Sequence, residues 1–238
     1  MDNIIERINI KLEDELMKKF PDHQERYEFA ANFCKSGDYV VDVACGCGYG
    51  TNILSQKSGN KTIGLDVDSD ALQWVNKYYE GNSNFLKITN GSFPLKEKIA
   101  DVIVSLETIE HVAKPENFLF EIKRILKVGG ILILSTPLNE TQRRFKPENY
   151  FHLREYNWEE FGDLVSKYFL IKERFSQISP ISELNTKLSR LSSYSRIKRI
   201  IPPTLKNFLK KILKANSGKI LKGFVRGLHT QIIIAIKI

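Results

Sequence analysis

A glycine-rich turn directly follows the first strand-length apolar run of the sequence. Tyr39–Ala44 is that run, and the turn is Cys45-Gly46-Cys47-Gly48-Tyr49-Gly50. Glycines allow a tight bend and let the backbone approach a ligand without a Cβ atom in the way. A short helix is expected next, over residues 52–58. Strand, glycine turn and helix in this order are typical of the first unit of a doubly wound α/β sheet; a purely structural turn is the alternative.

The rest of the sequence alternates between strand-length apolar runs and helical patterns. Further strands are expected over residues 61–65, 84–88, 100–105, 131–136, 170–176 and 229–238, and helices over residues 71–79, 115–127 and 159–169. Such alternation indicates a mainly parallel sheet with helices on both faces. We therefore expect a Rossmann-like, doubly wound α/β fold, whose mostly parallel seven-stranded sheet has an antiparallel C-terminal strand.

The pattern divides the chain into a core and two additions. Residues 1–37 are expected to form an N-terminal helical cap, interrupted at Pro21 because proline disfavours helix before it. Residues 38–177 and 229–238 form the core. Residues 178–228 form a basic helical insertion with eight Lys, four Arg and a single acid, although the net charge of all 238 residues is only +8.

The basic insertion contains an amphipathic helical pattern. Apolar residues recur at helical spacing from Leu205 to Leu213, with lysines between them. One interpretation is a surface helix that contacts an anionic membrane through residues 200–214. A second is a lid whose lysines bind phosphate groups. The third is a helix packed on the sheet or on a second subunit in a homodimer. No interleaved aromatic residues support nucleic-acid binding.

Composition limits the kinds of protein this chain can be. No secretory signal is present, and no apolar stretch approaches the roughly 20 residues of a membrane span. We therefore expect a cytoplasmic protein, with contact at the inner face of the membrane as an option. Cys34, Cys45 and Cys47 do not form a disulfide framework, and no second pair or nearby histidine completes a zinc site. No metal site is expected.

Two acidic residues indicate the kind of ligand. Asp66 ends the second expected strand, twenty residues after Gly46, where a doubly wound fold places the acid that binds ribose hydroxyls. The loop lacks the third glycine of the Gly-x-Gly-x-x-Gly fingerprint for dinucleotides, because Thr51 stands where that glycine would be. Asp42, beside the loop, suits a cationic or amine-bearing ligand better than a diphosphate. S-adenosylmethionine has both a ribose and cationic groups.

Several ordered motifs together resemble the class I S-adenosylmethionine-dependent methyltransferases. The similarity covers residues 20–177 and 229–238. It includes the glycine loop, Gly64-Leu65-Asp66-Val67-Asp68, the segment 101–111 that ends in Glu107-Thr-Ile-Glu110-His111, and the segment 124–137. More narrowly, residues 23–27 and 151–156 resemble bacterial methyltransferases of surface-polysaccharide and sugar-modification pathways. The resemblance implies a methyltransferase that uses S-adenosylmethionine as its cofactor.

The resemblance also implies a set of cofactor contacts. Ala44, Gly46 and Gly48 would line the methionine moiety, and Ser105 would lie beside the sulfonium. Where family members often carry an acid, this chain has Asn90, which can bond the adenine amine. Asp66 would bind the ribose, Val67 would cover the adenine, and Arg26 or Tyr27 would close over the cofactor. The full set of implied contacts from the core is Asp42, Ala44, Cys45, Gly46, Gly48, Asp66, Val67, Asn90, Gly91, Ser105, Leu106 and Glu107.

Two histidines are candidates for handling the acceptor's proton. Methyl transfer needs an aligned acceptor, and a hydroxyl acceptor also needs a base. His111 follows the fourth strand where that strand meets the cofactor; a histidine that only fixes this loop is the alternative. For His152, the second candidate, contact with the substrate is favoured over a role as base. Further candidates for substrate binding are His23, Glu110, Arg154 and Tyr156. The alternative for His23 is an ordinary histidine on the surface of a helix, and the alternative for Glu110 is a helix cap.

The expected function is methyl transfer to a hydroxyl or amine of a small molecule. A sugar or glycan precursor for surface polysaccharide is the favoured acceptor, and a quinone or another small metabolite is the alternative. A non-catalytic cofactor-binding or membrane-surface module is the alternative from another class. Methylation of nucleic-acid bases is disfavoured: the Asn/Asp-Pro-Pro-aromatic run of amino-methylating enzymes does not follow the fourth strand, and no cysteine follows Cys47.

Overall fold

The computed structural model describes residues 21–59, 61–78, 84–139, 149–177, 220–223 and 230–238. The helices in these ranges are α2 (Pro21–Ala31), α3 (Tyr49–Ser58), α4 (Ser69–Tyr78), the 3-10 helix η2 (Ile109–His111), α5 (Pro115–Ile125) and α6 (Trp158–Ser166). The strands are β1 (Val40–Val43), β2 (Thr62–Asp66), β3 (Asn84–Lys87), β4 (Ala100–Ser105), β5 (Leu126–Pro137), β6 (Leu170–Gln177), β7 (Ile220–Lys222) and β8 (Thr230–Ile236).

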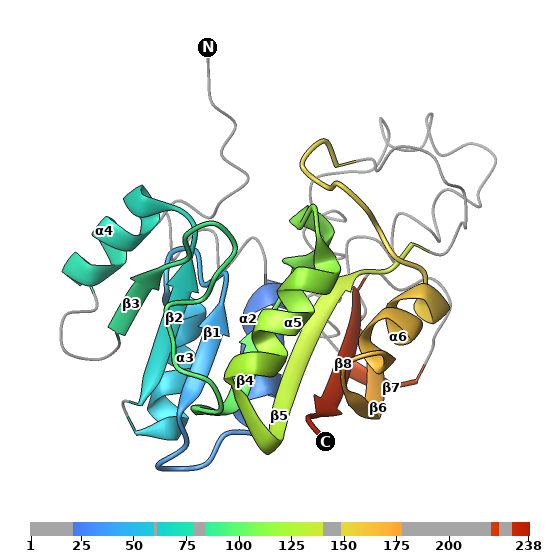
Figure 1. Cartoon of the computed structure of the whole chain (residues 1–238), viewed down its shortest axis with the longest axis horizontal. Coiled ribbons are helices and arrows are strands. Elements are labelled where there is room, and N and C mark those ends of the chain that lie inside the picture. Colours follow the sequence, from blue (N-terminus) through green and yellow to red (C-terminus); the bar gives the residue numbers. More distant parts are fainter. Residues whose placement is uncertain (1–20, 60, 79–83, 140–148, 178–219, 224–229) are drawn as a thin grey trace, which may run out of the picture.

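The strands form one sheet in the order β3-β2-β1-β4-β5-β8-β6-β7. The first five strands in this order pair in parallel. β8 pairs antiparallel to both β5 and β6, between which it lies. The strand order reverses direction at β1 and β4, the two strands at which a doubly wound sheet binds its ligand. The expected fold class is thereby confirmed (Figure 1).

Helices cover both faces of this sheet, as the alternation predicts. One buried cluster packs α5 and α6 against residues such as Val41, Ile103 and Leu132. A second cluster packs α2 and α3 against the opposite face, including Val40 and Val104. In Figure 1, α5 lies in front of the sheet and α2 behind it. Because β1 and β4 are buried on both faces, their sequences are continuously apolar except at Asp42, Asp101 and Ser105.

The structure differs from the expectation at three places. An eighth strand, β7, pairs with β6 and lies within the segment predicted to be a helical insertion. Its three residues are too few to give a strand pattern. β5 begins at Leu126 and continues through Gly129 and Gly130, which were expected to separate helix from strand. α3 begins at Tyr49, earlier than expected. The rest of the N-terminal cap and the amphipathic pattern from Leu205 lie outside the described residues.

None of the helices that the structure describes has the length and hydrophobicity needed to cross a membrane.

A close contact between α2 and α3 holds the N-terminal helix over the glycine turn. A Cβ atom at Gly50 would lie 2.0 Å from the ring of Tyr27, so only glycine allows this approach. The Tyr27 ring also packs edge-to-face on Tyr49, with ring centroids 5.5 Å apart. The glycine at position 50 is therefore required for packing, and it does not face the ligand.

Substituting this glycine should destabilise the fold. We expect Gly50→Ala to lower the free energy of unfolding by about 1–3 kcal/mol, because overpacking of a filled site costs that much. The gain in helix propensity, about 1 kcal/mol, offsets the loss only in part. Chemical denaturation measures the change, with Gln56→Ala on the exposed face of α3 as control. A variant as stable as the parent would show that Tyr27 can move away at no cost.

Candidate functional site: the carboxyl edge of β1, β2 and β4

The turn after β1 has a backbone conformation that opens it towards a ligand. Ala44 and Gly46 have φ values of 64° and 53°, in the left-handed region. Gly48, with φ of 78°, precedes α3 as its N-cap residue. A Cβ atom at Gly46 would meet nothing within 4 Å, whereas one at Gly48 would meet the Phe85 ring at 2.9 Å. Gly46 thus faces open space, and Gly48 is needed for packing.

Asp66 at the end of β2 holds this turn in place. Its Oδ2 accepts a hydrogen bond from the Gly46 amide at 2.7 Å, and its Oδ1 accepts one from the Asp68 amide at 2.9 Å. The side chain is buried, and the neighbouring Val67 is 57% exposed. A carboxylate can accept about four hydrogen bonds. Asp66 therefore keeps capacity for two ligand hydroxyls, beside an exposed apolar side chain.

Asp42 is buried beneath the turn and is satisfied by the protein. Its two oxygens accept hydrogen bonds from Tyr27 Oη at 3.2 Å and from Thr51 Oγ1 at 2.7 Å. Burial, and to a smaller extent the charge of Asp66, raise the pKa of Asp42 to about 7, against the opposing effect of the two hydrogen bonds. Burial likewise raises the pKa of Tyr27. These two predicted cofactor residues tie α2 and α3 to β1.

Cys45 and the turn at Asn90 and Gly91 complete the predicted cofactor set on this side. Cys45 is buried, and burial raises the pKa of its thiol well above the ordinary value. Asn90 and Gly91 form an exposed turn after β3, with φ values of 53° and 75°. A Cβ atom at Gly91 would meet nothing within 4 Å, so this turn also borders open space.

Two polar residues of α2 that were predicted to contact ligands, Arg26 and His23, point into the protein. Arg26 is only 6% exposed, and it donates from Nη1 to Gln177 Oε1 at 2.5 Å. Its Nε has no hydrogen-bond partner among the described residues. The Nδ1 atom of His23 hydrogen-bonds to Tyr49 Oη. Burial, and then the charge of Arg26, lower the pKa of His23 to about 3. His23 is therefore neutral and fixed to α3, unlike a surface histidine.

The end of β4 places two further predicted residues at the same edge. Ser105 and Leu106 are buried, and Ser105 Oγ has no hydrogen-bond partner among the described residues. Glu107 follows with a left-handed φ of 51°. Its Oε1 accepts a hydrogen bond from Ser135 Oγ at 2.8 Å, and its amide donates to the same hydroxyl at 3.1 Å. The pairing of β1 with β4 brings this loop beside the glycine turn.

Glu110 is a fully buried carboxyl group with one unsatisfied oxygen. Its Oε2 accepts a hydrogen bond from Thr136 Oγ1 at 2.9 Å, but its Oε1 has no hydrogen-bond partner among the described residues. Burial raises the pKa of Glu110 well above its usual value, and the charge of Glu107 raises it further. The Glu110 carbonyl accepts the Leu153 and Arg154 amides, so the two loops are joined here.

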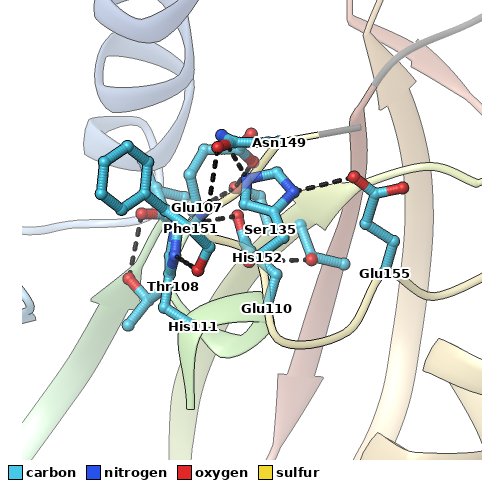
Figure 2. Close-up of polar contacts among 11 residues, drawn as sticks. Glu107, Thr108, Glu110, His111, Ser135, Asn149, Phe151, His152 and Glu155 are labelled. Carbon is cyan, nitrogen blue, oxygen red and sulfur yellow. Dashed lines mark hydrogen bonds and ion pairs between the residues drawn. The ribbon is translucent and has the colours of Figure 1, made fainter. Parts of the chain in front are cut away.

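The tautomer of His111 is set by a backbone carbonyl. Its Nδ1 lies 3.0 Å from Phe151 O, and because a carbonyl only accepts, Nδ1 carries the proton. The lone pair is therefore on Nε2, which lies 3.9 Å from Glu110 Oε1. This separation is too long for a hydrogen bond. His111 is one-third exposed and presents an available basic nitrogen (Figure 2).

His152 lies against His111 and is held on both sides. The two ring centroids are 4.9 Å apart, in an edge-to-face arrangement. Nδ1 of His152 lies 2.8 Å from Glu155 Oε1, and its Nε2 lies 3.0 Å from Asn149 Nδ2 (Figure 2). Asn149 Oδ1 accepts the Phe151 amide, which fixes the amide so that Nδ2 donates to His152. In this arrangement His152 is the less available base.

Arg154 and Tyr156 occupy different environments. Arg154 is exposed, and its guanidinium lies 4.8 Å from the centroid of the Tyr156 ring. The Tyr156 side chain is buried in the cluster under α6, and its Oη has no hydrogen-bond partner among the described residues. Burial raises the pKa of Tyr156 to about 12. Arg154 alone of this pair is placed to meet a molecule from solvent.

The sequence did not predict the residues that orient the predicted site residues. They are Asn149 and Glu155 around His152, Ser135 and Thr136 beneath the two glutamates, and Gln177 and Thr230 around Arg26. Ser135 and Thr136 end β5 next to the end of β4, so their position follows from the parallel pairing of these strands. Gln177 and Thr230 have no sequence signal, because their partner Arg26 is distant in the chain. Asn149 and Glu155 lie only three residues from His152, but in a loop without a periodic pattern.

Comparison with known proteins agrees with this geometry. Residues 41–134, from β1 to β5, match the sequence model of the family described as the methyltransferase domain. This match contains the glycine turn, Asp66 and the loop from Ser105 to His111. Residues 41–134 are therefore similar to a methyltransferase domain. The family and the fold imply S-adenosylmethionine as the cofactor of this domain.

Individual proteins that are similar to this chain are named as methyltransferases. The chain is 32% identical over 151 residues to a protein of Mycolicibacterium smegmatis named a probable S-adenosylmethionine-dependent methyltransferase, covering 61% of this chain and 56% of that protein. It is 34% identical over 115 residues to the mitochondrial ubiquinone biosynthesis O-methyltransferase of Dictyostelium discoideum, covering 43% of this chain and 36% of that enzyme. The chain thus spans about half or less of the length of these curated relatives.

A solved structure supports the fold. A S-adenosylmethionine-dependent methyltransferase from Aquifex aeolicus superposes with a TM-score of 0.60 at 19% identity, covering 94% of this chain and 98% of that one. At this identity the likeness shows the fold alone.

The residues of this methyltransferase domain fit S-adenosylmethionine. Open space lies in front of Gly46, where a side chain would otherwise stand. Asp66 has free acceptor capacity for the ribose, and the exposed Val67 can cover the adenine. The unpartnered Ser105 hydroxyl lies at the end of β4, where the resemblance places the sulfonium. When bound, the cofactor supplies an electrophilic methyl group on a sulfonium.

Proposed function

We propose that this protein transfers a methyl group from S-adenosylmethionine to a hydroxyl or amine of a small molecule. The observation that carries the proposal is the polar cluster of Glu107, Glu110, His111 and His152 at the edge of the sheet that also carries the glycine turn. A cofactor-binding module without turnover would not need an available imidazole beside its cofactor.

The chain's own residues would perform three tasks in this reaction. The glycine turn and Asp66 bind the cofactor. The carboxylate of Glu107, held by Ser135, favours positive charge near the end of β4. His111 takes up the acceptor's proton at Nε2, because its Nδ1 proton is engaged by Phe151 O. The assignments of His152 and Arg154 to the acceptor are part of the same proposal.

The proposed acceptor is a sugar or a glycan precursor for surface polysaccharide. Support comes from the resemblance of residues 23–27 and 151–156 to enzymes of such pathways, and from the acidic character of the cluster, which suits neutral hydroxyl-bearing groups. A quinone is the second candidate, supported by the ubiquinone biosynthesis relative. The cytoplasmic location, the membrane contact through residues 200–214 and the homodimer stay predictions.

An acceptor screen tests the proposed function. The purified protein is incubated with methyl-labelled S-adenosylmethionine and with nucleotide sugars, lipid-linked sugars or hydroquinones, and S-adenosylhomocysteine and labelled product are quantified. We expect turnover with a sugar-type acceptor. Turnover with hydroquinones alone would select the second candidate. Cofactor binding without S-adenosylhomocysteine from any acceptor would contradict methyl transfer and support a binding module.

A further inference from the structure

The cluster beside the cofactor turn also has the features of a metal site. One ligand atom from each of Glu110, His111 and His152 lies within 4.8 Å of the other two. The three residues come from two loops that are joined where the Leu153 and Arg154 amides bond to Glu110 O. Two imidazoles and a carboxylate, with space for a further ligand, are the donor set of many catalytic zinc sites.

Both histidines have a proton on Nδ1, which bonds to an acceptor that is not one of the three residues. Nδ1 of His111 bonds to a backbone carbonyl, and Nδ1 of His152 bonds to the Glu155 carboxylate (Figure 2). Carbonyls and carboxylates are the usual outer partners of metal-binding histidines, because they fix the tautomer and leave Nε2 as the ligand. At His152, a cation would replace the hydrogen bond that Asn149 donates to Nε2.

The third ligand is a carboxylate oxygen without a partner. Glu110 has no exposed surface, its Oε1 makes no hydrogen bond to the described residues, and this atom is the one that lies 3.9 Å from His111 Nε2. A buried oxygen left unpaired costs free energy unless a proton or a cation satisfies it. The separation is too long for a direct bond between the two side chains, but a bound cation can bridge it.

We propose that Glu110, His111 and His152 bind one divalent transition-metal ion of the zinc type. The two imidazole ligands favour Zn²⁺, Co²⁺ or Ni²⁺ over Mg²⁺, which prefers oxygen ligands. This inference rests on the proposed function and replaces its proton step: when the cation is bound, an acceptor hydroxyl that binds to it would release its proton to solvent, and His111 would act as a metal ligand and not as the proton acceptor. The role of His111 as proton acceptor then applies to the metal-free protein alone. Local spacing in the sequence predicts no metal site, because these three residues come from two loops that are far apart in the chain.

Metal binding can be measured without any methyl transfer. Tag-free protein is stripped with chelator and titrated with Zn²⁺ by calorimetry and with Co²⁺ by visible absorption. We expect one ion per chain and no binding of Mg²⁺. His111→Ala and His152→Ala should each weaken binding by about tenfold or more, and Glu155→Gln, which alters an outer partner, by about 10–100-fold. Circular dichroism confirms that each variant is folded.

A neighbouring carboxylate provides the matched control. Glu107 lies in the same loop as Glu110, but its Oε1 is engaged by Ser135 and it is not one of the three proposed ligands. Glu110→Gln should weaken binding, and Glu107→Gln should not. No Zn²⁺ or Co²⁺ binding by the parent, unchanged affinity in both histidine variants, or an equal loss in Glu107→Gln would overturn the proposal. None of these readouts depends on methyl transfer, so the two proposals can fail separately.

Discussion

Replacing Asp66 by alanine is expected to abolish binding of S-adenosylmethionine and to leave the domain folded. In the proposed complex this carboxylate accepts hydrogen bonds from the two ribose hydroxyls. Hydrogen bonds to a charged group contribute about 1.5–3 kcal/mol each, so losing two weakens binding by about 100-fold or more. The same substitution frees the amides of Gly46 and Asp68, which loosens the turn and adds to the loss.

Calorimetry with S-adenosylmethionine measures this effect. Asp70→Ala is the matched control, because Asp70 is an exposed acid at the start of α4, a few residues away. We expect the control to bind as the parent does. Affinity retained in Asp66→Ala, with an unchanged melting temperature, would reject the assignment of the ribose to Asp66.

The substitution His111→Ala is expected to lower turnover by about 10²–10⁴-fold at saturating cofactor, which is the usual contribution of a positioned proton acceptor. Its cofactor affinity should stay near that of the parent, because neither Asp66 nor the glycine turn contacts this side chain. The fold-decrease in turnover should become smaller as pH rises, because a larger fraction of a hydroxyl acceptor is then ionised without a protein base. His152→Ala should lose less, because Asn149 already occupies Nε2 of His152.

Steady-state rates from pH 6 to 10, together with calorimetry, test this prediction. The result expected for a histidine that merely fixes the loop is a lower melting temperature with turnover close to the parent's. If turnover falls only in proportion to cofactor affinity, the proton-acceptor role of His111 is wrong and the loop-fixing role replaces it.

Local patterns predicted most of the fold. The strands β1, β2 and β4 and the C-terminal strand follow from apolar runs buried on both faces, and the helices between them follow from their periodicity. The doubly wound class of the sheet follows from the glycine turn, which is typical of the first unit of such a fold. β7 was missed because three residues paired at the edge of the sheet carry no periodic signal.

The site also has one part that follows from the sequence and one part that does not. The glycine turn, Asp66 and the loop from Ser105 to His111 follow strands, so the parallel pairing alone brings them to one edge. The contact of His111 with Phe151 and the burial of Glu110 depend on a later loop that folds back over this edge. Sequence spacing cannot show such contacts. The inward direction of Arg26 and His23 likewise depends on packing of α2 against strands far along the chain.

The position of β8 has a consequence for how this protein is made. Residues 230–236 are synthesised after all the other described strands, yet they fill the gap between β5 and β6. Until this segment leaves the ribosome, β5 and β6 each have one edge without its partner strand, and unpaired strand edges can recruit neighbouring chains. The sheet therefore closes after translation of its core, and the period before closure is when a nascent chain most needs protection by chaperones.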